Sequence, residues 1–101
     1  MTQQIVVQYI PDIVRDEKIN IAVVVVDSSQ ISRAFTSNWL RVEVFAGHDI
    51  QFLKELENEV WTKDEVLKLA SNSTGSIKFV LRGWSILPLD IAFEDAKKRY
   101  L

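Results

Sequence analysis

The chain has 101 residues, of which 48% are hydrophobic and 26% are charged, and its formal net charge at pH 7 is −2. These values are typical of one globular domain and exclude a disordered chain. No apolar run approaches the ~20 residues of a membrane-spanning helix. The absence of cysteine excludes disulfides and thiol catalysis, and the slightly acidic balance disfavours nucleic-acid binding.

The N-terminal half is predicted to form three β-strands. β-Branched and aromatic residues favour a strand over 5–10, which Pro11 ends because proline lacks the N–H donor. A strand over 19–26 is the strongest, because its valine run is apolar without alternation, as in a central strand covered on both faces. Residues 31–36 predict a more polar third strand, and the short connections favour antiparallel neighbours.

The second half is predicted to be mainly helical. Asp49 is expected to cap one helix, and Thr62 and Glu65 have the spacing of a capping box that begins another. Residues 38–46 show both helical and alternating apolar spacing, so their structure is left open. The predicted elements are helices over 50–61 and 63–70, a strand over 76–82, and a final helix that Asp90 caps and that ends near Tyr100.

The element order βββααβα predicts a single α+β domain over residues 1–101. The expected architecture has two layers, with the helices packed on one face of a mainly antiparallel sheet of about four strands. The N-terminal residues lack the pattern of a signal peptide. Together with the absence of cysteine, this predicts a cytoplasmic protein.

No combination of residues predicts a catalytic centre. Asp12 and the run Asp16–Lys18 imitate a metal-dependent nuclease motif, but both acids fall in one short loop instead of on two strands. His48 has no nucleophile placed beside it by any motif, and the three glycines are too far apart to form a phosphate-binding loop. We therefore predict no catalytic residue, no metal ligand and no cofactor.

Three tryptophans and five phenylalanines are a large aromatic content for a small core. Core packing is the default for each ring, but a core of this size cannot easily enclose all of them. An exposed tryptophan is a favoured anchor of protein interfaces, so the candidate interface residues are Trp39, Trp61 and Trp84. An uncovered face or edge of the valine-rich sheet would also need a partner.

The densest polar cluster lies between Asp12 and Asn20, within the stretch YIPDIVRDEKINIAVV from Tyr9 to Val24. This stretch resembles an uncharacterised bacterial family called domain of unknown function 3037. Its members begin with a similar Tyr-x-Pro-Asp, followed by arginine, glutamate and asparagine, and then by a valine-rich strand. Glycine is common in the family where this chain has Asp16 and Ala22.

The resemblance implies a small cytoplasmic protein without an assigned activity, often encoded beside a HipA-like serine/threonine kinase. It also implies which positions of the charged loop matter. Arg15 would offer a bidentate fork to a carboxylate or phosphate, and Glu17 and Asn20 would hold it in place. The candidate binding residues are Tyr9, Asp12, Arg15, Glu17 and Asn20.

Two functions from different classes remain open. The first is a non-enzymatic protein-interaction module, either a homo-oligomer or the accessory subunit of a HipA-like kinase-type partner. The alternative is a small-ligand binding protein or enzyme that uses the loop Asp12–Asn20 for a phosphate or nucleotide ligand. Neither a membrane nor a nucleic acid is expected as a partner.

Overall fold

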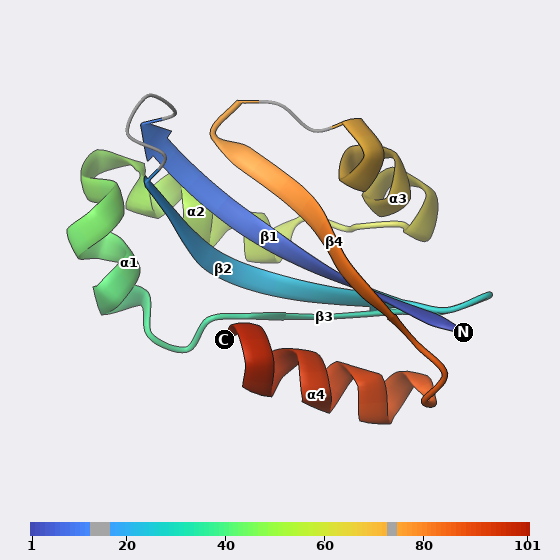
Figure 1. The fold of residues 1–101 in the computed structure, drawn as a ribbon. Helices are drawn as coiled ribbons and strands as arrows, with labels where there is room; N and C mark the ends of the chain where they lie inside the picture. Colours follow the sequence, from blue (N-terminus) through green and yellow to red (C-terminus); the bar gives the residue numbers. More distant parts are fainter. Residues whose placement is uncertain (13–16, 73–74) are drawn as a thin grey trace.

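The computed structural model describes residues 1–12, 17–72 and 75–101. Within these ranges the chain forms an antiparallel sheet of strand order β3-β2-β1-β4, with helices on both of its faces (Figure 1). The elements are β1 (Thr2–Asp12), β2 (Glu17–Val26), β3 (Ile31–Phe35), α1 (Trp39–Ala46), the short 3-10 helix η1 (Gly47–Asp49), α2 (Ile50–Glu55), a second 3-10 helix η2 (Leu56–Asn58), α3 (Lys63–Asn72), β4 (Ile77–Ser85) and α4 (Leu89–Tyr100).

The valine run of β2 is buried on both sides of the sheet. Val24 and Val26 belong to one apolar cluster, whereas Val23 and Val25 belong to another. None of these four side chains is more than 1% exposed. The lack of alternation in this part of the sequence therefore reflects a strand that is covered on both faces, as predicted.

The larger core lies between the sheet and the segment from α1 to α3. The described residues of α1, α2 and α3 include one fully enclosed side chain each, namely Val42, Leu53 and Val66. Side chains of β1 and β2 and half-buried aromatic rings supply most of the remaining contacts. This layer is therefore held mainly by the sheet, and α3 is attached through few buried residues.

Helix α4 packs on the opposite face of the sheet (Figure 1). Its two buried residues are Ala92 and Ala96, which lie in one cluster with valines of β1 and β2. Small side chains let the helix backbone come close to the sheet without leaving voids. Gln4 Nε2 also donates to the Ala92 carbonyl and to Asp95 Oδ2, each at 3.0 Å, so a buried amide joins the same two layers.

The predicted α+β fold is confirmed, and the described residues contain the expected strands in antiparallel pairing. The expectation that all helices share one face is wrong, because α4 covers the face opposite α1–α3. The physical reason lies in β2 itself. A strand with valines on both faces needs a covering layer on each side, and a two-layer arrangement leaves one of them in water.

The helix predicted over 50–61 is shorter than expected. Arg33 Nη1 and Nη2 donate to the carbonyl oxygens of Leu56 and Glu57, at 3.4 and 2.8 Å. A continuing α-helix would offer those same carbonyls to N–H groups four residues later. Trp61 instead leaves the helical path and packs its ring against two phenylalanines of β3 and β4.

Helix ends agree with the predictions only in part. The Thr62 hydroxyl accepts from the Glu65 N–H at 3.3 Å, as predicted for the start of α3. The segment left open forms α1, where Asn38 Oδ1 accepts from the Arg41 N–H at 3.2 Å. Asp49 is the residue that precedes α2, as predicted, but its side chain makes no capping hydrogen bond. The cap predicted at Asp90 is wrong, because Pro88 precedes α4 and Asp90 lies in its first turn.

Candidate functional site

The predicted binding residues Tyr9 and Asn20 lie on opposite faces of the sheet. Tyr9 belongs to the core on the α1–α3 side, whereas Asn20 Nδ2 donates to the Tyr100 carbonyl of α4 at 3.1 Å. The register explains the separation. Gln8 is the partner of Asn20, and successive residues of a strand point to opposite faces. These two side chains therefore cannot line a common pocket.

The remaining members of the predicted loop site fall at the end of the β1–β2 hairpin. Asp12 and Glu17 are backbone partners there, and their side chains lie outside the described residues, as does Arg15. The bidentate contact expected of Arg15 therefore stays a prediction.

Tyr9 is linked to Asp49, the residue predicted to cap a helix. The tyrosine is 2% exposed, and its Oη donates to Asp49 Oδ2 at 2.5 Å. Burial, and then the hydrogen bond to and charge of Asp49, raise the pKa of Tyr9 to about 12. A hydroxyl with this pKa keeps its proton at neutral pH, so the pair joins β1 to η1 and is unsuited to acid–base chemistry there.

Amide side chains on the α4 side of the sheet form a second set of links between layers. Gln8 Nε2 donates to Asn20 Oδ1 at 3.1 Å, and Asn20 in turn donates to the last residue of α4. No buried side-chain nitrogen or oxygen of the described residues lacks a hydrogen-bond partner. Asn20 therefore has a structural role that is complete without a ligand.

Trp39 and Trp61 are half-buried members of an aromatic row that crosses β3. Phe35 stacks on Trp39 with ring centroids 6.3 Å apart and contacts Trp61 at 5.4 Å. The Arg33 guanidinium lies 4.6 Å from the centre of the Trp61 ring. Trp39 Nε1 donates to Glu57 Oε1 at 3.1 Å. Both indoles thus pack within this molecule, although each keeps an exposed part.

Trp84 differs from the other two, because 61% of it is exposed. Ile86 and Leu87 follow it in the turn from β4 into α4, and Ile91 lies in the first turn of α4; they are 89%, 43% and 50% exposed. We call these four residues the apolar corner; Figure 1 shows this turn beside the N-terminus. Contiguous apolar surface marks contact sites, whereas scattered apolar side chains do not, and these four residues lie within eight positions of one another along the chain. The sequence signal for Ile86 and Leu87 is an apolar stretch in a predicted connection, whereas Ile91 lies in the predicted final helix.

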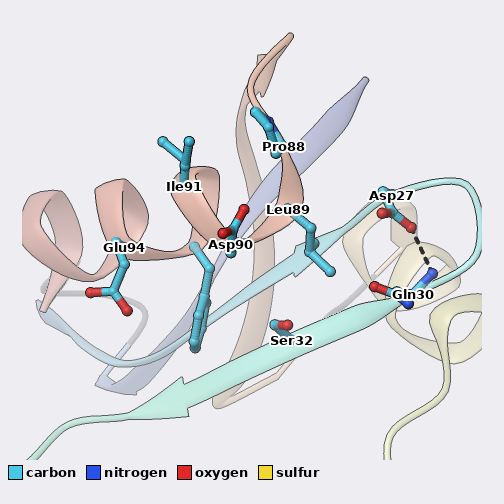
Figure 2. A pocket seen from close by; sticks show the side chains of 9 residues that line it. Asp27, Gln30, Ser32, Pro88, Leu89, Asp90, Ile91 and Glu94 are labelled. Atoms are coloured by element: carbon cyan, nitrogen blue, oxygen red, sulfur yellow. Dashed lines mark hydrogen bonds between the residues drawn. The ribbon is translucent and has the colours of Figure 1, made fainter.

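A groove of about 920 Å³ lies between the first half of α4 and β3 (Figure 2). Its acidic groups are Asp27, Asp90 and Glu94. Asp27 accepts two backbone N–H bonds of the β2–β3 turn, at 2.8 and 2.6 Å, and these bonds lower its pKa. Glu94 pairs with Lys97 at 2.8 Å. Two of the three carboxylates therefore already have local partners, and the groove offers few free groups that could bind a ligand or catalyse a reaction.

Comparison of the chain with protein families, curated proteins and solved structures finds no match. The likeness of residues 9–24 to domain of unknown function 3037 therefore stays an expectation. Among the described residues, no three His, Cys, Asp or Glu side chains are placed to share a metal ion. No helix in the described part of the chain is long and apolar enough to cross a membrane.

Proposed function

We propose that this protein is a non-enzymatic interaction module whose contact surface is the apolar corner. The observation that carries the proposal is the exposure of Trp84, Ile86, Leu87 and Ile91 in one short stretch of chain. Burying a large apolar side chain contributes about 1.5–3 kcal/mol, and tryptophan is enriched among the residues that dominate interfaces. A partner that covers this corner would therefore gain most of its affinity there.

The neighbouring strand edge adds backbone groups to this surface. Among the described strands β4 pairs with β1 alone, which leaves its other edge unpaired. Unpaired edges accept strands from other chains. The register shifts by one residue at Arg82, and such bulges limit indiscriminate edge pairing. We therefore assign the binding energy to the side chains of the corner, with the edge as a minor contributor.

Two partners fit this role, and they differ in symmetry. In a homodimer the corner of one copy would meet the same corner of the other around a two-fold axis. The heterologous candidate is a HipA-like kinase-type protein, which the resemblance of residues 9–24 suggests. No observation favours the alternative function of phosphate or nucleotide binding, because Tyr9 and Asn20 lie on opposite faces of the sheet.

Sedimentation velocity over a range of protein concentrations tests the homodimer. We expect the unaltered chain to dimerise and the double variant Trp84→Gln/Ile86→Gln to remain monomeric. The matched control is Leu40→Gln/Val44→Gln, which changes two exposed apolar residues of α1. This control should dimerise as the unaltered chain does.

A photo-crosslinking amino acid at position 86 tests the heterologous partner, with position 44 as the matched control site. We expect one definite product from position 86 in cells, identified by mass spectrometry and lost when Trp84→Gln is added. A chain that is monomeric at all concentrations and gives the same products from both positions would contradict the proposed function.

A further inference from the structure

We propose that a hollow beneath α3 binds a small hydrophobic cation, such as an ammonium group carried on a single ring. The hollow has a volume of about 140 Å³ and lies between η2, α3 and β4. We call it the α3 pocket. It shares no residue with the apolar corner, so its ligand and the proposed protein partner are tested separately.

The α3 pocket has a buried apolar floor. Leu56, Val66 and Phe79 line it, and each of them is less than 9% exposed. Trp61 forms part of its wall. Protein interiors are normally packed without voids, and an enclosed apolar cavity of roughly 150 Å³ binds benzene. The size and lining of the α3 pocket therefore select a ligand of about one six-membered ring.

The hollow follows from how the chain reaches α3. Trp61 packs its ring on Phe35 of β3 and Phe79 of β4, and the first turns of α3 supply one fully buried side chain, Val66. The space between them is left without a side chain of this molecule to fill it. A ligand of matching size would restore these missing contacts, so its binding should raise the melting temperature of the protein.

The mouth of the α3 pocket determines which charge it prefers. Glu59 and Glu65 are exposed there, and no Lys, Arg or His of the described residues lines the pocket. Two cations border the pocket without lining it: Arg33 lies over the Trp61 ring and bonds to carbonyls of η2, and Lys68 lines a neighbouring hollow together with Glu65 and Leu69. A cation at the mouth would meet two carboxylates, whereas an anion would be repelled.

Three ring compounds of equal size test the charge preference: benzylammonium, benzyl alcohol and benzoate. Each is titrated into the full chain, and binding is followed by tryptophan fluorescence and by the amide signals of Val66 and Ile77. We expect saturable binding of benzylammonium, about fivefold tighter than that of benzyl alcohol, from the attraction of exposed charges. Benzoate should bind more weakly than either.

Variants at the mouth separate the apolar and charged contributions. Leu69→Trp should fill the opening and weaken binding of all three compounds at least tenfold, whereas Leu40→Trp on α1 should leave binding unchanged. Glu59→Gln/Glu65→Gln should remove the preference for the cation and retain benzyl alcohol. Because Leu69 is 41% exposed, its replacement should not prevent folding; Leu69→Ala, which widens the mouth, checks this by keeping the cation preference.

Three results would overturn the proposal. One is the absence of saturable binding by any compound, and another is benzoate binding as tight as that of benzylammonium. The third is unchanged binding in a folded Leu69→Trp variant. None of these results bears on the apolar corner, whose variants leave the α3 pocket intact.

Discussion

At the scale of single residues, the polar side chains that the sequence marks as candidate ligand contacts hold the layers of the fold together. Tyr9 reaches Asp49 on one face of the sheet, and Asn20 reaches the end of α4 on the other. Polar groups placed inside a domain are stable only when their hydrogen bonds are satisfied. The hydrogen bonds that Tyr9 and Asn20 make within the protein are therefore enough to explain why these polar residues occur in apolar strands.

The bond between Tyr9 and Asp49 can be tested by removing the hydroxyl. We expect Tyr9→Phe to lower the free energy of unfolding by about 1–2 kcal/mol, since an intramolecular hydrogen bond is lost. The loss stays modest because Asp49 is exposed and water can replace the tyrosine as its donor. Urea denaturation at pH 7 measures the change, and Asp49→Asn, which keeps an acceptor, should lose less stability.

Comparing the two proteins at alkaline pH tests the raised pKa of Tyr9. The pKa of Tyr9 is raised in the folded chain to about 12 from its ordinary value of 10.0, so the folded state holds this proton more tightly. Its stabilisation is complete below pH 10 and is lost as the pH rises through 12. The unaltered chain should lose stability across this interval, and Tyr9→Phe should lose less. Equal slopes in the two proteins would show that Tyr9 ionises normally.

At the scale of elements, side chains from distant segments decide where helices end and how closely they pack. Arg33 of β3 donates to the two carbonyl oxygens that would accept helical hydrogen bonds if α2 continued. The 3-10 helix η2 stands where the final turn of the predicted helix was expected. On the other face, the alanines of α4 permit close contact with Val6, Val23 and Val25. Local propensity thus sets where a helix can form, and the partner surface sets its length and depth.

Enlarging an alanine of α4 tests this close packing. Ala96 is fully buried against the valine face, so Ala96→Leu should destabilise the protein by about 1–3 kcal/mol through overpacking. The control Lys98→Leu introduces the same side chain on the exposed side of α4 and should change stability by about 0.5 kcal/mol or less. Thermal and urea unfolding measure both. Equal effects of the two variants would mean that α4 packs loosely.

At the scale of the whole molecule, the sheet is the middle layer and neither of its faces can be left uncovered. Val23 and Val25 are fully buried under α4, and Val24 is fully buried on the other side. Helix α4 follows all the other described elements along the chain, so a truncation before it leaves them intact. The face beneath it then becomes an exposed valine surface of the kind that aggregates.

We expect a chain that ends after Pro88 to lose cooperative unfolding and to bind the dye ANS, because the valine face is exposed to water. Calorimetry and dye fluorescence measure these changes. The variant Lys98→Ala, which keeps the helix but removes an exposed charge, is the control and should behave as the unaltered chain. A truncated chain that melts cooperatively and binds no ANS would show that α4 is not part of the core.

The sequence alone predicts the strands, the central position of β2 and the start of α3 at Thr62. Each of these predictions depends on the spacing of residues that are close in the sequence, and such local patterns can be read without the tertiary structure. Trp84 was a candidate from its residue type, but its exposure depends on which rings the core encloses. Trp39 and Trp61 pack on Phe35 in the aromatic row, whereas Trp84 is not part of that row and is exposed.

Only the tertiary structure decided the faces on which the candidate residues lie. The register shifts between Val7 and Gln8, so that Val7 pairs with Ala22 while Gln8 pairs with Asn20. Ile21 is the extra residue, and it shares the larger core with Ala22. A one-residue bulge reverses the face of everything before it, which turns Asn20 toward α4 and away from Tyr9. Composition and spacing cannot predict this register shift, because it depends on how β1 and β2 pair and not on either strand alone.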